Sequence, residues 1–164
     1  MICDMANSCA NAMTFFGVTQ RIYTLFYSIK RWKILWGHAL NLTLKPLSQT
    51  RWENRIESVK AIRYQAPQIR DVLYQLAETS ENPKTRSEII SLATYDIESF
   101  EFLLGMIIWY DMLFAINTIS KYLQCKDMDI VVTIDHLKGL IAFFKNYRET
   151  SFKSSMISAK EIAE

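Results

Sequence analysis

The sequence predicts an all-α fold, and three observations lead to this prediction. Only 4 Gly and 3 Pro occur in 164 residues, so the chain has little of the turn chemistry that a many-stranded sheet needs. Apolar residues recur at helical spacing along most of the chain. The β-branched run 130–134 is the best strand candidate, but it continues directly into helical spacing. Because half of the residues are hydrophobic, we expect one packed helical domain over residues 1–164.

The basic N-terminal segment, residues 1–49, is predicted to contain the first helices. A helix over residues 7–29 follows from an apolar stripe with helical spacing. A second apolar piece, residues 34–42, ends before Lys45-Pro46, because the residue before a proline avoids the helical conformation. The first stripe contains Phe15, Val18, Ile22, Leu25 and Phe26.

The next helix is predicted over residues 50–80. Thr50 and Glu53 are three residues apart, which is the spacing of a capping box at a helix start. Trp52 begins an apolar face that continues along the helix. Pro67 predicts a kink, because proline removes a backbone donor and clashes with the preceding turn.

The acidic segment 83–164 is predicted to form the remaining helices, with loops at 79–84 and 126–129 and a break near Asp96. The apolar run 102–110, bracketed by Glu101 and Asp111, is shorter than a membrane-spanning helix and indicates a core helix. Residues 149–164 are predicted to form a weak, polar terminal helix that docks poorly on the rest of the fold. The expected core residues of this segment are Leu103, Leu104, Ile107, Ile108, Phe114, Ile119, Val132, Leu137, Leu140, Ile141 and Phe144.

Charge is distributed unevenly along the chain. Residues 1–70 contain 10 Lys and Arg against 3 Asp and Glu, whereas residues 71–164 contain 9 against 14. One interpretation is a basic face that binds a polyanion. The other is that the two halves attract each other within one fold. The sequence supports both interpretations equally.

Arg51, Trp52 and Arg55 are the candidate DNA-binding residues at the predicted helix start. An indole can stack on an unpaired base, and arginines near a helix N-terminus can contact phosphate. The structural alternative is that Trp52 simply begins the apolar face. A second basic stretch with an interleaved aromatic residue suits the same ligand, and its candidate residues are Lys30, Arg31 and Lys33.

The sequence contains no recognisable catalytic, metal or cofactor motif. The three cysteines show no paired spacing, and no zinc-type or phosphate-loop motif is present. His38 and His136 are ordinary helix residues in this interpretation, and charged helix faces account for the carboxylates. We therefore expect no enzymatic activity, no resident metal and no small-molecule substrate. An odd cysteine number and the lack of a signal peptide predict an intracellular protein.

A series of short motifs resembles the middle of hAT-type transposases, in the same order along nearly the whole chain. Within that family it resembles the domesticated or decaying copies described as zinc-finger MYM-type-1-like proteins. The motifs are Asp4-Met5-Ala6-Asn7, the 15–23 stretch, Lys30-Arg31-Trp32, the 44–48 stretch, Thr50-Arg51-Trp52-Glu53, the 100–104 and 123–129 stretches and Tyr147-Arg148-Glu149-Thr150.

The resemblance implies a helical domain inserted into a ribonuclease-H-like core. That core's metal-binding Asp-Asp-Glu triad would lie outside this chain, so divalent metal is expected only in a full-length homologue. The family's Arg-Trp pair, which handles a flipped base, corresponds to Arg51 and Trp52. The resemblance also implies a nuclear location.

Together these observations predict a non-catalytic, transposase-derived fragment with weak DNA binding. The alternatives are a protein–protein interaction module, acting through exposed apolar helix faces, and an excerpt of an active transposase or nuclease. No membrane partner is predicted.

Overall fold

The computed structural model describes residues 9–27, 43–47, 52–127 and 129–163, which form helices and connections without a strand. In chain order the α-helices are α2 (Ala10–Phe26), α4 (Trp52–Thr79), α5 (Pro83–Ser91), α6 (Phe100–Leu123), α7 (Ile130–Asn146) and α8 (Phe152–Ala163). Two π-helical turns, η1 (Leu92–Asp96) and η2 (Tyr147–Ser151), continue α5 and α7. The predicted all-α class is confirmed for the described residues.

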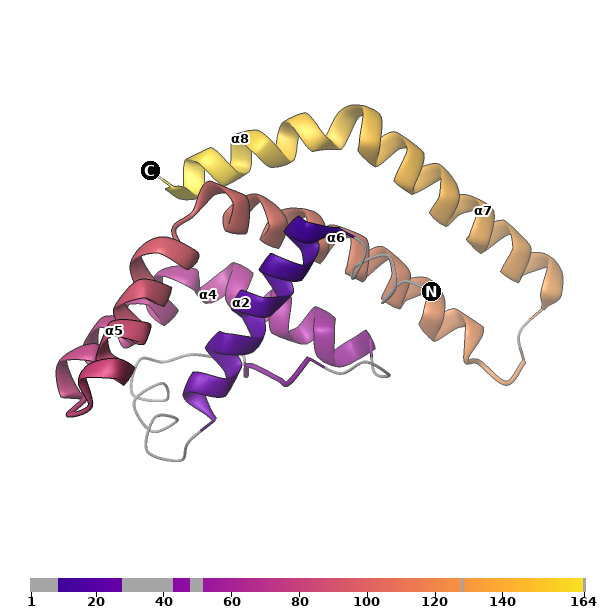
Figure 1. The fold of residues 1–164 in the computed structure, drawn as a ribbon. Coiled ribbons are helices and arrows are strands. Elements are labelled where there is room, and N and C mark those ends of the chain that lie inside the picture. Colours follow the sequence, from indigo (N-terminus) through magenta and orange to yellow (C-terminus); the bar gives the residue numbers. More distant parts are fainter. Residues whose placement is uncertain (1–8, 28–42, 48–51, 128, 164) are drawn as a thin grey trace.

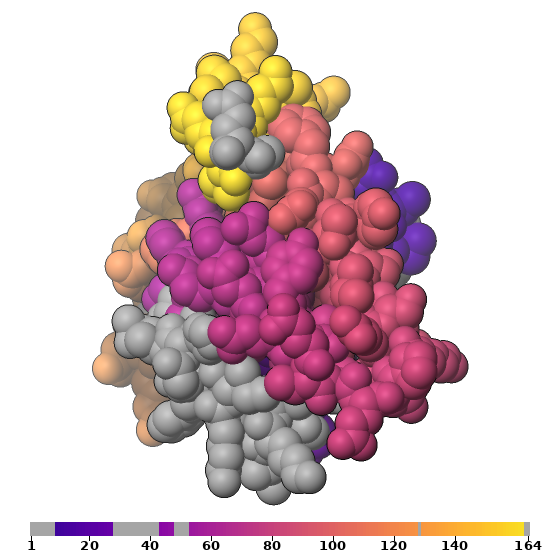
Figure 2. Space-filling model, turned by 90° about the vertical axis from the view of Figure 1, so that its left-hand side faces the viewer, coloured from indigo at the N-terminus to yellow at the C-terminus, as the bar shows by residue number. Residues whose placement is uncertain are grey.

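Helix α6 is the centre of the fold. It packs against α2, α4, α7 and α8. In Figure 1, α2 crosses α4 and α6, while α7 and α8 form an arch along the other side of α6. Figure 2 shows the end of the molecule where α8 rests above α4 and the start of α6. The arrangement leaves α7 at the outer edge.

The core lies between α2, α4 and α6. A Cβ atom at Gly105 would come 3.1 Å from Phe15 Cδ2, so the glycine allows α2 to close against α6. The side chains that are fully buried in this core include Ile22, Phe26, Val59, Ile62, Ile69, Leu73, Met106 and Leu113. The predicted stripe of the first helix is buried, except for partly exposed Leu25. That helix spans Ala10–Phe26, so residues 9 and 27 of the predicted 7–29 range are not helical.

Local sequence signals account for the breaks between helices. Gln65 is non-helical (φ −132°, ψ 18°) two residues before Pro67, which confirms the predicted kink. Asn82 caps α5, because its side chain accepts from the backbone N–H of Lys84 and Thr85. Both predicted loops are confirmed. The first is shorter than predicted and covers residues 80–82. Ser99 and Asp129 cap α6 and α7 in the same way.

The terminal region differs from its prediction. Ala159 is fully buried and Ser155 is 5% exposed, because α8 packs along α6. The prediction of a poorly docked terminal helix was therefore wrong. For α7 the error is the opposite one. The sequence predicted that it contributes core residues, but none of its residues is buried.

The predicted core list for the acidic segment is therefore correct only for two residues of α6. Leu103 and Ile107 are buried, whereas Phe114 is 56% exposed. Leu104, Ile108 and Ile119 are partly exposed. The residues predicted as the core of the last stripe, which lie half-exposed or exposed on α7, are Val132, Leu137, Leu140, Ile141 and Phe144.

Helix α6 also extends beyond the apolar run that the sequence delimits. It continues through Asp111 to Leu123, and by length and composition it is the one helix among the described residues that could cross a membrane. Four neighbouring helices pack on it, and Asp111 at its centre bonds to two other elements. These contacts are those of a core helix in a bundle.

Candidate functional site

The structure places one side chain of the predicted DNA-binding set. Helix α4 begins at Trp52, and Arg55 lies in its first turn with a partly exposed side chain. The guanidinium carbon of Arg55 is 5.2 Å from the centre of the Phe16 ring, a cation–π contact that attaches α4 to α2. The remaining positions, which lie outside the described residues or have undescribed side chains, are Lys30, Arg31, Lys33, Arg51 and Trp52.

Ion pairs join the basic and acidic halves. All of them are at least partly exposed, so each contributes only about 0–1 kcal/mol. They nevertheless occupy cations that a polyanion would otherwise contact, which favours mutual attraction of the two halves over a free basic face. The pairs are Arg21–Asp96 (2.8 Å), Arg63–Asp111 (2.9 Å), Arg70–Glu98 (3.0 Å) and Lys121–Glu53 (3.1 Å).

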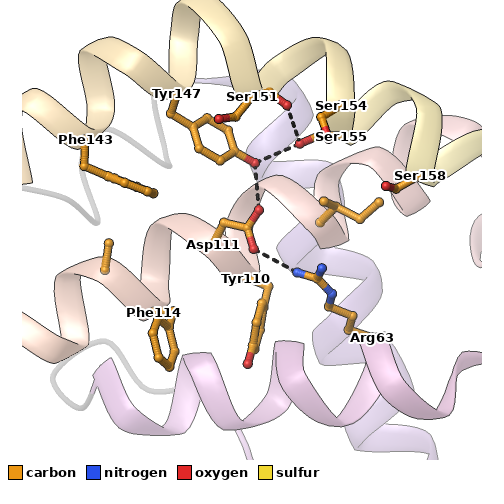
Figure 3. A pocket seen from close by; sticks show the side chains of 12 residues that line it. Arg63, Tyr110, Asp111, Phe114, Phe143, Tyr147, Ser151, Ser154, Ser155 and Ser158 are labelled. Atoms are coloured by element: carbon orange, nitrogen blue, oxygen red, sulfur yellow. Dashed lines mark hydrogen bonds and ion pairs between the residues drawn. The ribbon is translucent and has the colours of Figure 1, made fainter.

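A polar network connects α4, α6, η2 and α8 (Figure 3). Arg63 Nη1 donates to Asp111 Oδ1 at 2.9 Å, and the Tyr147 hydroxyl donates to Asp111 Oδ2 at 3.1 Å. The Tyr147 oxygen is also 3.0 Å from Ser155 Oγ. Because an unpaired polar group inside a bundle costs free energy, this network fixes how the α7–α8 arch sits on α6.

The network lines a cleft of about 420 Å³ between α6 and the arch. Its walls combine the Phe114 and Phe143 rings with the polar groups of the network and a row of serines. Figure 3 shows the two phenylalanine rings on one side of the cleft and Ser154, Ser155 and Ser158 on the other. Tyr110 lies between them. The guanidinium carbon of Arg63 is 4.6 Å from the centre of the Tyr110 ring. Arg63 is thus held by both the Asp111 carboxylate and the Tyr110 ring, and its positive charge has a structural role.

Tyr147 is the most perturbed group of the network. Burial, together with the neighbouring Asp111 carboxylate, raises the pKa of Tyr147 to about 12. The hydroxyl therefore remains protonated at neutral pH and serves as a donor.

A row of exposed apolar side chains lies on α7. Four side chains on one flank of this helix, Ile130, Ile134, Leu137 and Ile141, are 76%, 47%, 40% and 56% exposed. We call them the α7 stripe. The inner flank of the helix instead faces α6, where His136 stacks on Tyr122 at 4.7 Å between ring centres. Contiguous exposed apolar surface of this kind marks interaction sites in soluble proteins.

The described residues hold no group of three or more His, Cys, Asp or Glu side chains that could bind a metal ion. Several carboxylates of the acidic half have other contacts. Asp96 and Glu98 bond to arginines of the basic half, and Asp129 caps α7. Cys9 and Cys125 are exposed free thiols.

Sequence reasoning did not find the network of Arg63, Asp111, Tyr147 and Ser155. One signal was available: Asp111 interrupts the most apolar run, and a carboxylate inside such a run needs a partner. Its partners lie 48 and 36 residues away, so no spacing rule could identify them.

Comparison of this chain with protein-family models, with curated proteins and with solved structures gives no match.

Proposed function

We propose that this chain is a non-catalytic protein–protein interaction module that works through the α7 stripe. The observation that carries the proposal is the exposure of four large aliphatic side chains on one flank of a helix that buries none of its residues. A helix this apolar normally faces other protein. We further propose that the module derives from a hAT-type transposase, on the strength of the ordered motifs, and acts in the nucleus.

Quantitative affinity capture tests the interaction function. The bait is the whole chain, compared with a stripe variant that combines Ile134→Glu and Ile141→Glu. Ile157→Glu is the matched control, because Ile157 is 61% exposed on α8, away from the stripe. We expect the bound protein, including any second copy of the chain, to fall at least tenfold with the stripe variant, since burying a carboxylate is costly.

The control variant should retain that protein at the wild-type level. Equal retention by all three baits would show that the stripe binds nothing.

DNA binding is a second proposed function, and the start of α4 favours it. Backbone N–H groups at a helix N-terminus attract phosphate, and Arg55 lies partly exposed in this first turn. The ion pairs of Arg21, Arg63 and Arg70 limit the number of cations available to DNA. We therefore propose weak binding without sequence preference.

A salt titration of binding to single-stranded DNA tests this second function. Replacing Arg51 and Arg55 together by alanine should reduce the slope of log K against log salt by about 2, about 1 for each lost phosphate contact. Trp52→Ala should weaken binding by about 1–3 kcal/mol at every salt concentration, because stacking is independent of salt. Absence of binding by the wild-type chain at low salt would exclude DNA as a ligand of this chain.

A further inference from the structure

We propose that the cleft between α6 and the arch binds an uncharged, planar aromatic molecule with an amide-like edge, such as an aromatic carboxamide. This ligand site goes beyond the proposed interaction function, because no residue of the α7 stripe lines the cleft. Its volume of about 420 Å³ lies within the range of small-molecule sites, about 300–1,000 Å³. The rings, the charges and the hydroxyl groups of the lining each restrict which ligand fits.

Aromatic rings form two walls of the cleft. Tyr110 and Phe114 on α6 stack with 6.1 Å between their ring centres and 29° between their ring planes. Phe143 on α7 and Tyr147 on η2 form a second pair, with 5.6 Å between ring centres. Among the described residues no ring contact joins one pair to the other, and Figure 3 shows the two pairs on different sides of the cleft.

A planar ring placed between these pairs would contact aromatic surface on both sides. Phe114 is 56% and Phe143 is 37% exposed, so the bound ring would remove apolar surface of both side chains from water. Aromatic rings attract one another at centre-to-centre distances of about 4.5–7 Å, beyond the gain from buried area alone. The two walls therefore favour a flat aromatic ligand.

The lining carries no net charge. Among the described residues that line the cleft, Arg63 and Asp111 are the two with ionised side chains, and they pair at 2.9 Å. Their side chains are only 26% and 33% exposed, so the pair lies largely out of water. A charged ligand would compete for one partner and leave the other charge unpaired, which costs free energy. The cleft therefore favours an uncharged ligand.

Two serine hydroxyls on the α8 wall are available for hydrogen bonds. Ser154 and Ser158 are four residues apart, so they share one face of α8, and both line the cleft. Neither hydroxyl has a hydrogen-bond partner among the described residues, whereas Ser155 bonds within the network. A serine hydroxyl can both donate and accept. An amide edge, with its C=O and N–H groups, matches this wall better than an aromatic hydrocarbon does.

The walls are positioned before a ligand arrives. Asp111 on α6 accepts hydrogen bonds from Arg63 on α4 and from Tyr147 on η2, which holds the arch on α6. A preformed site loses less conformational entropy when a ligand binds. The ligand is bound and chemically unchanged, in line with the expected lack of enzymatic activity.

Titration of the isotope-labelled whole chain with benzamide, followed by amide chemical shifts in NMR spectra, tests this site. Benzamide is uncharged and planar and has the amide edge, whereas benzoate has the same ring with a negative charge. We expect saturable shifts with benzamide, largest in the cleft-lining segments of α6, α7 and α8. The dissociation constant for benzoate should be at least about tenfold higher, because the anion would disrupt the Arg63–Asp111 pair.

Substitutions in the lining identify the groups that bind. Phe143→Ala should weaken benzamide binding at least about fivefold, the lower end of the loss when alanine replaces an aromatic residue that stacks on a base. Phe152→Ala is the matched control and should leave the affinity unchanged, because Phe152 is 43% exposed on α8 and does not line the cleft. Ser158→Ala should weaken binding about two- to tenfold, the net effect of one hydrogen bond.

Circular dichroism is the folding control for these variants. Should Phe143→Ala lose its helical signal, Phe114→Ala takes its place, since Phe114 is the more exposed of the two rings. Absence of saturable shifts with benzamide would overturn the proposal. Equal affinities for benzamide and benzoate, or equal losses in the cleft variant and in Phe152→Ala, would overturn it as well.

Discussion

Replacing Met106 by alanine is expected to destabilise the protein by about 2–5 kcal/mol, the range for truncating a fully buried methionine. Met106 is 0% exposed in the first half of α6, the helix on which four others pack. The truncation removes buried apolar atoms and leaves a cavity that the rigid helix pairs close only in part. Urea unfolding followed by circular dichroism measures the change as a lower midpoint at constant slope.

Met13→Ala is the matched control for this prediction. Met13 lies on α2 and is 51% exposed, so the same chemical change should alter stability by no more than about 0.5 kcal/mol. Similar losses for the two variants would mean that α6 is not the centre of a packed core.

The second large effect concerns the alkaline stability of the Tyr147 network. The folded-state pKa of Tyr147 is raised to about 12 from an ordinary value of 10. Its contribution is therefore complete below pH 10 and is lost as the pH rises through 12, since the unfolded chain releases the proton first. The loss is on the order of 2–3 kcal/mol, because one pKa unit corresponds to about 1.4 kcal/mol.

Urea unfolding of the wild type and of Tyr147→Phe between pH 8 and pH 12 measures this effect. At pH 8 the variant should be less stable by about 1 kcal/mol, because it lacks the hydroxyl that bonds to Asp111. The difference should shrink above pH 10 and then reverse. Burial also raises the pKa values of Tyr23 and Tyr110, so both proteins share part of the alkaline loss.

The exposed Tyr95 offers a control substitution, Tyr95→Phe, whose stability should follow that of the wild type across this pH range. A constant difference between the wild type and Tyr147→Phe would show that the Tyr147 hydroxyl does not titrate in this window.

The structure explains why the charge distribution in the sequence allowed two interpretations. The basic and acidic halves fit both a polyanion-binding face and internal attraction. The partners in the Arg21–Asp96 and Arg70–Glu98 pairs are 75 and 28 residues apart in the sequence, so the local spacing of residues cannot predict these contacts. Only the folded arrangement of α2, α4 and η1 brings these charges together.

Local sequence signals set where helices start and kink. Pro67 kinks α4, and Asn82, Ser99 and Asp129 cap the N-termini of the helices that follow them. These signals are reliable because a cap or a proline acts on backbone groups only a few residues away.

Which apolar faces are buried depends on how the helices pack against one another. Helix α7 is more apolar than α8, yet Ile141 is exposed and Ala159 is buried. Periodicity predicts that a helix has an apolar face, but burial depends on a neighbouring element, and α8 packs against α6 more extensively than α7 does. The α7 stripe remains accessible for the same reason, because no described element of this chain covers it.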